Sequence, residues 1–596
     1  MQNPAPTSTR RAIRQRWVEE TPDPEKSAAL AKTAKLPLVL AELLVARGIT
    51  LPEQAFAYLN PDMEQLHDPL RILGMSAAVE RVEQAIAARE LILLYGDYDV
   101  DGTTAVVLLK TAIEMLGGNV RFHVPHRLRE GYGLQSSVLE EEFNEGVRLV
   151  ITVDTGMRAF AEAETARRLG LDLIITDHHL PDAHEAVPDA LAILNPNQHG
   201  CAYPEKSLCG AAIAFKLAQA LLERRDADRT RKKILPSFLK MTAIATIADA
   251  VPLKGENRTI AALGLRELSR PVGTGLRELF AVAKLDPASK PITGFDVAFR
   301  LAPRINAAGR MDVAGEVIEL FTTRETARAR ELAQKLERLN RERRDTEAFA
   351  LRTIEERLET DAALATEPLL VVDGEGWHRG VIGILASRVV ERTAKPALVV
   401  SVEDGVAHGS GRSVDGFHLL NAIESCSDIF TRFGGHAFAV GFALPADQLP
   451  ALKQRLSAYA AEHLAAREPE SILHIHAELP LDRITAVLAG WLRRLEPLGH
   501  GNPEPTFVAR NVRMIAPVRL MKERHIRLEL SQQPKDSATF SGHAIKAVGW
   551  NMAWTAECLN LREGSQIDIA YRLRENDHPE FGGLEIEIAG LRMHED

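Results

Sequence analysis

Between about residues 77 and 180, short continuous apolar runs alternate with longer segments in which apolar and polar residues are mixed. A short apolar run without helical periodicity is typical of a strand buried on both faces, and the longer segments are typical of helices. This alternation predicts a mostly parallel, doubly wound α/β sheet. The predicted strands are 91–94, 119–124, 149–153 and 171–176, and the predicted helices are 77–89, 103–116, 136–144 and 159–169.

The rest of the chain follows other patterns. The first 60 residues are mixed, with a start rich in proline and threonine that we expect to lack order, and a predicted helix at 37–47. Residues 324–358 are highly charged and contain neither glycine nor proline, which predicts one extended helix between two domains. A second α/β pattern begins at Pro368. Short β-like runs after about Glu468 predict a small barrel, with strands at 506–515, 526–530, 545–550, 565–573 and 584–591.

These changes of pattern divide the chain into five predicted regions, and a length of 596 residues is ample for several domains. The regions are an N-terminal segment at 1–55, a first α/β domain at 56–323, a linking helix at 324–366, a smaller α/β domain at 367–466 and a C-terminal β-barrel at 467–596.

Composition narrows the class of protein. Apolar residues make up 45% and charged residues 26% of the chain, which is ordinary for a soluble globular protein. The net charge of −10 argues against a generally basic nucleic-acid binder, although phosphate-facing charge can be local. Four cysteines without a CxxC pair indicate neither a disulfide framework nor a zinc site. With no apolar leader and no long apolar stretch, we expect a cytoplasmic protein that does not contact membranes.

Three carboxylates, Asp97, Asp99 and Asp101, follow the first predicted strand within five residues. They repel one another, and a hard divalent cation with oxygen ligands would offset that repulsion. A solvated acidic turn is the plain alternative. An EF-hand loop is excluded, because its twelfth position is Leu108 in place of glutamate and a strand precedes it.

Similar residues end the next two predicted strands: Asp154 follows one, and Asp177-His178-His179 follows the other. The carboxyl ends of parallel strands form the ligand crevice of such sheets. Asp249 ends an otherwise apolar stretch, where an ionised carboxylate is costly without a cation, a cap or an ion pair. Carboxylates with imidazoles suit Mn²⁺ or Mg²⁺, and two such ions side by side suit phosphoester hydrolysis.

Four segments resemble the metal motifs of the DHH phosphoesterase superfamily: GDYDVDG (96–102), VDTG (153–156), Asp-His-His (177–179) and IADAVP (247–252). The second α/β domain carries segments that are similar to the substrate-binding domain of that superfamily: GWHRGVIGILASRV (376–389), GSGRS (409–413) and FGGHAFAVG (433–441). Together with EGYGL (130–134), RINAAGRM (304–311) and GHGNPEP (499–505), the set resembles the RecJ family of single-strand-specific exonucleases over about residues 40–590.

The resemblance implies roles for individual residues. The implied metal ligands are Asp99, Asp101, Asp154 as the bridging ligand, His178 and Asp249, with Asp97 as a ligand or orienting group and His179 facing the substrate phosphate or the leaving oxygen. Ser410 and Arg412 would hold a terminal 5′ phosphate. The implied cleft residues are Arg127, Arg304, Asn306, Arg310, His378 and His436.

Simple chemistry supports part of this assignment. GSGRS and GGH are glycine-rich, so backbone N–H groups can approach a phosphate, with Arg412 and His436 as further donors. The C-terminal barrel would be an OB-fold that binds single strands. Residues 509–530 carry six Lys/Arg against two acids in an acidic chain, and the groove residues we select are Arg519, Lys522 and Arg524.

The implied function is a 5′→3′ exonuclease that releases mononucleotides from single-stranded DNA with two Mn²⁺ or Mg²⁺ ions, in DNA repair and recombination. The resemblance also implies work with single-strand-binding protein and a helicase, and we expect a monomer. Two alternatives stay open: a phosphodiesterase for short oligoribonucleotides or cyclic dinucleotides, and a catalytically silent replication scaffold. The extra barrel argues against the first, and the intact metal motifs argue against the second.

Overall fold

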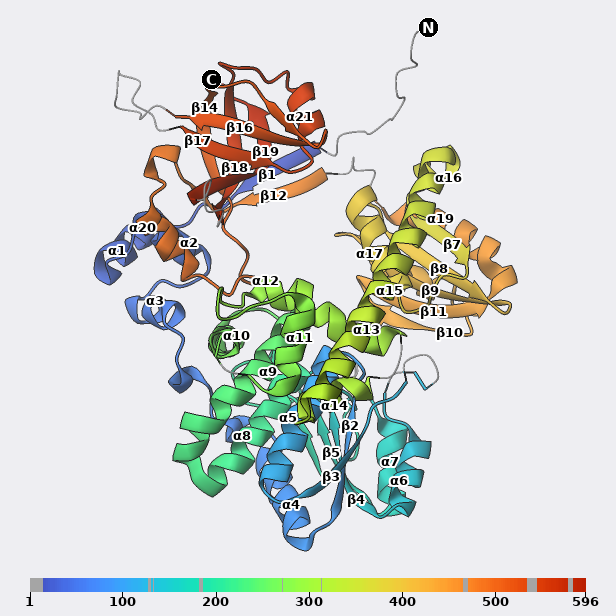
Figure 1. Cartoon of the computed structure of the whole chain (residues 1–596). Helices are drawn as coiled ribbons and strands as arrows, with labels where there is room; N and C mark the ends of the chain where they lie inside the picture. Colours follow the sequence, from blue (N-terminus) through green and yellow to red (C-terminus); the bar gives the residue numbers. More distant parts are fainter. Residues whose placement is uncertain are drawn as a thin grey trace. The chain divides into compact units, whose positions relative to one another are not determined.

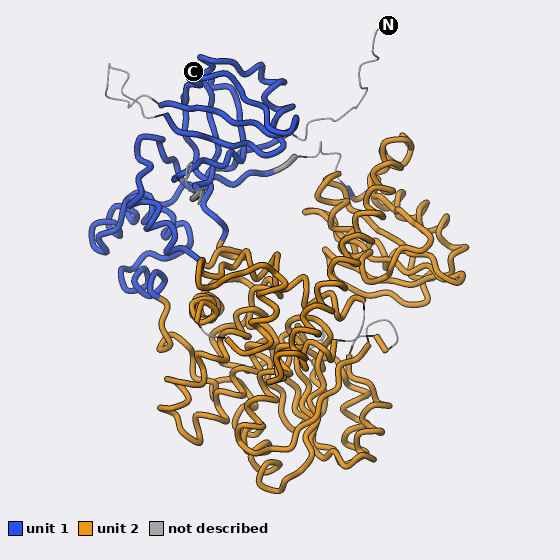
Figure 2. The backbone as a smooth tube through the Cα atoms, in the orientation of Figure 1, with its two compact units in different colours: residues 1–60, 464–496, 503–596 blue, residues 61–463, 497–502 orange. Residues whose placement is uncertain are grey.

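The computed structural model describes residues 14–126, 130–131, 133–181, 186–270, 272–311, 314–464, 470–532, 544–576 and 583–595. The chain forms two compact units (Figure 2). Unit 1 combines Met1–Asn60 with Leu464–Glu496 and Pro503–Asp596, whereas unit 2 contains Pro61–His463 and Pro497–Asn502. Among the helices within these described ranges, none has the length and apolar content that a membrane span requires.

The first half of unit 2 is built on a five-stranded parallel sheet, as predicted (Figure 1). Its order is β3 (Asn119–His123), β2 (Leu91–Gly96), β4 (Val147–Val153), β5 (Asp172–Thr176) and β6 (Ala192–Leu194).

Both faces of this sheet are buried, which explains the continuous apolar runs of its central strands. Ile92 and Leu94 of β2 pack in one core with helices α4 (Met75–Ala88), α5 (Val100–Met115), α8 (Gly210–Arg229) and α9 (Leu235–Ala248). Leu93 and Tyr95 pack in a second core with α6 (Ser136–Asn144) and α7 (Phe160–Leu169). The sheet is therefore doubly wound.

A buried ion pair ties α8 to the helix α10 (Gly255–Leu268). Lys216 Nζ lies 2.5 Å from Glu256 Oε1, and both side chains are fully buried. The hydroxyl of Tyr203 donates to Glu256 Oε2 at 2.6 Å, and the backbone N–H of His67 donates to Oε1 at 2.8 Å. Glu256 thus has several donors around it, as a buried charge requires.

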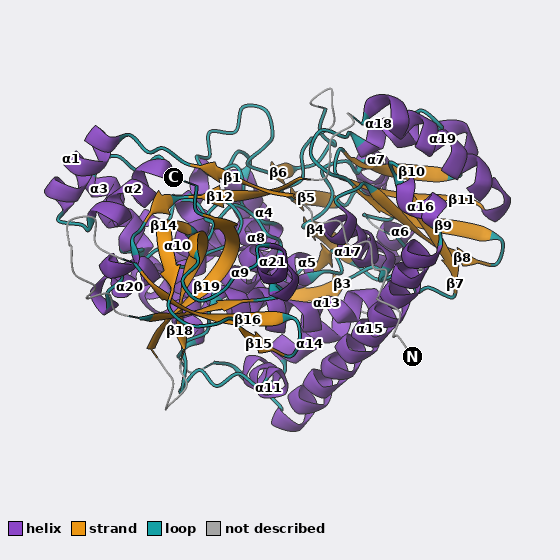
Figure 3. Cartoon of the chain, turned by 90° about the horizontal axis from the view of Figure 1, so that it is seen from above, coloured by secondary structure: helices purple, strands orange, loops and turns teal. Residues whose placement is uncertain are grey.

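The predicted long helix is α15 (Thr326–Thr360), which begins beside α13 (Ala302–Met311) and α14 (Gly315–Thr322) (Figure 3). Leu332 and Leu336 in its first half belong to the core of the parallel-sheet domain. Ala350 and Ile354 in its second half belong to the core of the next domain. The helix therefore joins two hydrophobic cores.

That next domain, the smaller α/β domain, has a mixed sheet in the order β10-β11-β9-β8-β7. The strands are β7 (Leu370–Glu375), β8 (Ala397–Glu403), β9 (Val406–Arg412), β10 (Arg432–His436) and β11 (Ala439–Pro445). Only β7 and β8 run parallel among these strands. Helix α17 (Ile382–Thr393) packs against β8 and β9.

Unit 1 holds the C-terminal β domain. Its sheet runs β13 (Ala477–Glu478), β14 (Phe507–Met514), β18 (Gln566–Asn576), β19 (Gly583–Met593), β17 (Ile545–Gly549), β16 (His525–Ser531) and β15 (Arg519–Met521), and β14 also pairs with β16. The pairing of β14 with β16 makes a circuit of five strands. Asp568 of β18 accepts hydrogen bonds from Asn511 N, Arg592 and His594.

The proline- and threonine-rich start that we expect to lack order falls within residues 1–13, which lie outside the described residues. The rest of the N-terminal segment contains more elements than the one helix predicted there. Strand β1 (Arg14–Glu19) pairs in parallel with β12 (Glu470–Ile475), and helices α1 (Pro24–Ala34), α2 (Leu38–Ala46) and α3 (Pro52–Leu59) follow it. The predicted helix at 37–47 is confirmed as α2. The strand was missed because its sequence, RQRWVE, is mostly polar and its partner lies far along the chain.

Candidate metal centre and substrate pockets

The predicted ligand residues converge at the carboxyl ends of β2, β4 and β5. Three sets of ligand atoms each lie within 4.8 Å of one another: Asp97 with Asp99 and Asp154, Asp154 with His178 and His179, and Asp101 with His178 and Asp249. Asp154 and His178 each belong to two sets. All of these residues except Asp101 line a cavity of about 350 Å³, which Asn306 and Arg310 also line.

This cluster is electrostatically unfavourable without a cation. Asp97, Asp101 and Asp154 are each 6% exposed or less. Burial, and then the charges of the neighbouring carboxylates, raise the pKa of Asp154 well above its usual value and raise that of Asp249 to about 8. The buried Asp154 Oδ1 accepts no hydrogen bond from a described residue, although His178 Nε2 lies 3.2 Å away. Divalent cations with oxygen ligands fit this donor set.

Local backbone structure fixes two of the carboxylates. Asp99 caps α5, because its Oδ1 accepts from the N–H groups of Asp101 (2.8 Å) and Gly102 (3.1 Å). Asp101 accepts from the first N–H groups of α8, those of Gly210 (2.6 Å) and Ala211 (2.8 Å). The positive end of a long helix therefore stabilises the charge of Asp101.

Asp154 lies in a left-handed backbone conformation, with φ of 60°. This conformation is uncommon outside glycine but is tolerated by aspartate and asparagine. A Cβ atom at Gly210 would lie 2.6 Å from the Cβ of Asp154. The packing of α8 against this turn therefore requires glycine at that position.

Asp177 orients His179. Its Oδ1 lies 2.7 Å from His179 Nδ1 and accepts from the backbone N–H groups of His178 and His179, while Oδ2 accepts from Met157 N. Burial lowers the pKa of His179, but the hydrogen bond and charge of Asp177 outweigh burial and raise it to about 9. The ring is thus held as a proton donor that faces the cluster.

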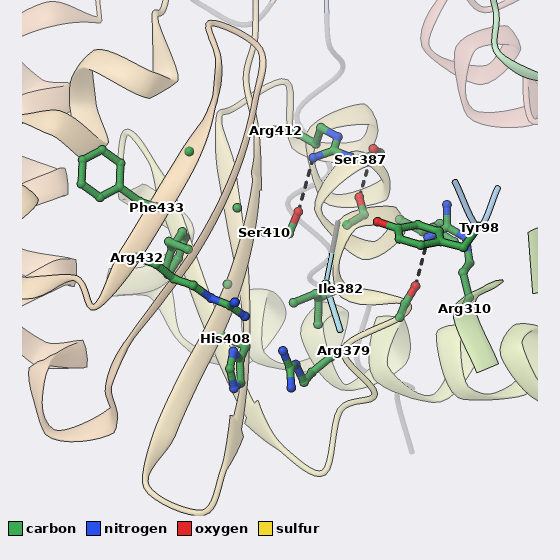
Figure 4. A pocket seen from close by; sticks show the side chains of 18 residues that line it. Tyr98, Arg310, Arg379, Ile382, Ser387, His408, Ser410, Arg412, Arg432 and Phe433 are labelled. Carbon is green, nitrogen blue, oxygen red and sulfur yellow. Dashed lines mark hydrogen bonds between the residues drawn. The ribbon is translucent and has the colours of Figure 1, made fainter. Parts of the chain in front are cut away.

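A second cavity, of about 810 Å³, adjoins the first, because Tyr98 and Arg310 line both (Figure 4). Two of the predicted site residues, Ser410 and Arg412 of β9 in the smaller domain, line this second cavity. Arg412 Nη1 lies 3.4 Å from Ser410 Oγ and donates to Gly411 O at 2.8 Å. Arg310 Nη1 donates to Gly380 O at 3.0 Å, which connects α13 to the loop before α17.

The other predicted cleft residues lie in different surroundings. Asn306 Oδ1 accepts from Val100 N at 3.1 Å and so holds the acidic loop. Arg304 forms an ion pair with Glu337 of α15 at 2.6 Å and lines neither cavity above.

His378 and His436 lie at different places in the smaller domain. His378 Nδ1 accepts from Gly380 N at 3.0 Å. His436 lines a third cavity, of about 840 Å³, together with His178 and His179. Arg127 lies outside the described residues.

The predicted groove residues Arg519, Lys522 and Arg524 lie on the β15–β16 hairpin of unit 1. Beside it, Trp550 and Trp554 are 53% and 46% exposed, and the Trp550 ring packs edge-on against His525. The sequence analysis missed both tryptophans, although an aromatic residue beside a basic strand is a signal for single-strand binding. It also missed Tyr98 and the further arginines of the second cavity.

Comparison with known proteins agrees with these observations. The chain matches the models of the DHH family, N-terminal domain at 91–246, the DHHA1 domain at 366–462 and the RecJ OB domain at 475–589. It is 36% identical to the single-stranded-DNA-specific exonuclease RecJ of Bacillus subtilis, over 95% of this chain and 69% of that protein. The corresponding RecJ of Dickeya dadantii is 35% identical, over 91% and 94% of the two chains. The chain belongs to the RecJ family.

Solved RecJ structures agree in fold. RecJ of Thermus thermophilus in complex with Mn²⁺ matches with a TM-score of 0.81 and 28% identity, over 98% of this chain and 80% of that one. A second RecJ structure, bound to manganese, matches with a TM-score of 0.58 and 33% identity, over 70% and 98%. The match with the complete two-unit chain confirms the predicted fold class, and the metal-bound RecJ structures accord with the acidic cluster of this chain.

Proposed function

We propose that the protein is a single-stranded-DNA-specific exonuclease that removes mononucleotides in the 5′→3′ direction by metal-dependent phosphodiester hydrolysis. The observation that carries this proposal is the cluster of seven carboxylate and imidazole residues, which adjoins a cavity lined by Ser410 and Arg412. The relatives that are named single-stranded-DNA-specific exonucleases support the substrate class.

Two Mn²⁺ or Mg²⁺ ions would be held by Asp99, Asp101, Asp154, His178 and Asp249, with Asp97 as a further ligand or an orienting group. Membership in two ligand sets supports Asp154 as the bridging residue. Asp101 keeps further lone pairs beside those that accept from α8. When bound, the ions would activate water and stabilise charge on the phosphoryl and leaving oxygens.

The protein's own residues would position the strand and move a proton. His179, held by Asp177, would donate to a phosphate oxygen or the leaving oxygen. Ser410 and Arg412 would anchor the terminal 5′ phosphate by charge-assisted hydrogen bonds. With the 5′ end fixed beside the metal cluster, only the first phosphodiester would reach the ligands, which accounts for polarity and for mononucleotide products.

The other predicted cleft residues within the described ranges fall into three groups in this scheme: Arg310 with His436, Asn306 with Arg304, and His378 alone. Arg310 lines both cavities and His436 shares one with His179, so we assign both to strand contact. The bond from Val100 supports a positioning role for Asn306, and the ion pair to α15 supports one for Arg304. We keep His378 as a cleft residue that shapes the loop before α17.

In unit 1, Arg519, Lys522 and Arg524 with the neighbouring tryptophans would bind the unpaired strand by charge and stacking. We also propose the boundaries of the five sequence-derived regions as the domain boundaries. Two of the family matches lie within one region each, and the DHHA1 match (366–462) begins one residue before its region, which supports this division. A role in repair and recombination, single-strand-binding protein and a helicase as partners, and a monomeric state stay predictions.

The test is digestion of a single strand labelled at its 3′ end, with Mn²⁺ or Mg²⁺, beside the same strand in a duplex. We expect a descending ladder of labelled fragments from the single strand only. Immediate release of label as a mononucleotide would overturn the polarity. Absence of cleavage with either ion would favour the scaffold alternative. Arg412→Ala should reduce the preference for a 5′-phosphorylated end, whereas Arg388→Ala, on the exposed face of α17, should not.

A further inference from the structure

Three basic side chains gather in the second cavity beside Ser410: Arg379, His408 and Arg432 (Figure 4). We call them the basic cluster. Arg379 comes from the loop before α17, His408 from β9 and Arg432 from the edge strand β10. None of them belongs to the set assigned above to metal or to the terminal phosphate.

Strand register places the cluster next to the terminal-phosphate residues. His408, Ser410 and Arg412 alternate along β9 and point to one face, with about 6.6–6.8 Å between successive members. Across the sheet, Ala443 of β11 is paired with both His408 and Arg432. Directly paired residues of antiparallel strands share a face, so Arg432 can extend over the small Ala443 side chain toward His408.

The charges of the cluster are mutually unfavourable. Burial, followed by the positive charges of Arg379 and Arg432, lowers the pKa of His408, and the negative charge of Glu403 only partly opposes this effect. Within the described ranges, neither the Arg379 side chain nor the Arg432 side chain forms a hydrogen bond or an ion pair. Like charges held together in a cavity without a protein counterion are typical of an anion-binding site.

The amount of positive charge exceeds what one phosphate needs. Arginines 310, 379, 412 and 432 line the cavity, and no carboxylate of the described part of the chain lines it. A terminal monophosphate carries about 1.5 to 2 negative charges. The cavity of about 810 Å³ has room and charge for additional phosphates next to the one at Ser410 and Arg412.

We propose that the basic cluster binds the outer phosphates of a polyphosphorylated 5′ end, so that the protein accepts 5′-triphosphorylated single strands. The inference rests on the proposed function, because Ser410 and Arg412 would hold the innermost phosphate. In the reaction on such an end, water adds to the phosphorus between the first two nucleotides. The bond to the 3′ oxygen breaks, that oxygen takes a proton, and the first product is a nucleoside 5′-triphosphate.

The experiment compares two single strands of one sequence, with a 5′-monophosphate or a 5′-triphosphate, at subsaturating concentration in excess Mg²⁺. We expect kcat/KM to be about ten-fold higher for the triphosphorylated strand, the effect of one charge-assisted hydrogen bond. The double variant Arg379→Gln/Arg432→Gln should bring the ratio of the two kcat/KM values to about one. Arg388→Gln should keep the wild-type ratio, because the Arg388 side chain lies outside the cavity and forms ion pairs with Glu347 of α15 and Glu391 of α17.

Each other outcome is decisive. Equal or slower cleavage of the triphosphorylated strand, with normal cleavage of the monophosphorylated one, overturns the basic-cluster assignment and leaves the proposed function intact. A ratio that survives in the double variant also overturns it. Release of dinucleotides from the monophosphorylated strand would instead assign the cluster to the terminal phosphate of a strand that is bound one nucleotide further in. Failure to cleave either strand would contradict the proposed function itself.

Discussion

Replacing Asp154 with asparagine tests two properties of the acidic cluster: how much its mutual repulsion destabilises the fold without metal, and how strongly it binds metal. Asparagine keeps the shape of the side chain and tolerates the left-handed backbone at this position, where alanine would add about 1–2 kcal/mol of strain. The substitution removes one buried negative charge from a group of mutually repelling carboxylates. In the absence of metal, the variant should therefore be more stable than the wild type.

The size of the gain follows from the buried, charged Oδ1 atom, which accepts no hydrogen bond from a described residue; asparagine can place its uncharged amide N–H2 group there, as a donor to the neighbouring carboxylates. Such an atom costs about 1–3 kcal/mol, and each kcal/mol changes the melting temperature of a domain of this size by about 2–4 °C. The sign depends on pH. Because the fold raises the pKa of Asp154, its ionisation cost is absent below the unfolded-state value and grows as the pH rises toward the folded-state value.

Metal should reverse the order of stability. An ion present at 100 times its dissociation constant stabilises the wild type by about 2.7 kcal/mol, which raises its melting temperature by about 5–10 °C. The variant should gain less, because it lacks the carboxylate that two of the ligand sets share. The assay is thermal unfolding of both proteins at pH 5 and pH 8, with EDTA or with Mn²⁺. Asp189→Asn, which removes an exposed carboxylate, is the matched control. A variant that melts below the wild type in EDTA at pH 8, or an equal Mn²⁺ shift in both proteins, would refute the reasoning.

Three further predictions concern other parts of the chain. Glu256→Gln should destabilise the protein by about 3–5 kcal/mol in urea unfolding, because it leaves the buried Lys216 without an anion, and adding Lys216→Met should recover most of the loss. Burial would raise the pKa of Asp568, but its hydrogen bonds outweigh burial and lower that pKa. Asp568→Asn should therefore lower the melting temperature at pH 7, and the difference from the wild type should vanish as the pH falls below about 4. Gly309→Ala should reduce kcat/KM by about 10- to 100-fold and also lower the melting temperature, because its Cβ would lie 2.3 Å from Tyr98 O at the edge of both cavities and would displace that backbone.

Each of these predictions has a contrary result. An additive loss in the double variant at Glu256 and Lys216 would show that the two charges are not coupled. A difference between Asp568→Asn and wild type that is constant with pH would exclude an ionic contribution. Normal cleavage by Gly309→Ala would show that Tyr98 need not hold its place.

The sequence predicted the elements around the metal cluster well, because those strands are buried on both faces and their apolar runs are unbroken. The helix predicted at 136–144, for example, is α6 (Ser136–Asn144). Once the strands are predicted, the residues at their carboxyl ends are known as well. The convergence of Asp97, Asp154 and His178 could therefore be predicted. The sequence could not reveal that Asp101 meets the start of α8, since that contact joins residues more than 100 positions apart.

The same limit applies to the cleft residues. Arg304 and Asn306 look like equivalent polar residues of one motif, but one meets Glu337 and the other meets the backbone of Val100. Only the packing of α13 between its neighbours decides which contact each residue makes. Strand β1 is a comparable case. Its own polar sequence does not predict a strand, and its extended backbone depends on pairing with β12, far along the chain.

The pairing of β1 with β12 also determines when unit 1 can be completed during synthesis. Arg14 aligns with Glu470, so about 450 residues must leave the ribosome between the two strands. At about 5–20 residues per second, this separation corresponds to roughly 20–90 seconds. During that time, unit 2 can fold with nearly all of its chain present, whereas β1 has no partner strand. Strand β1 is therefore made long before its partner and is among the last elements to reach its final pairing.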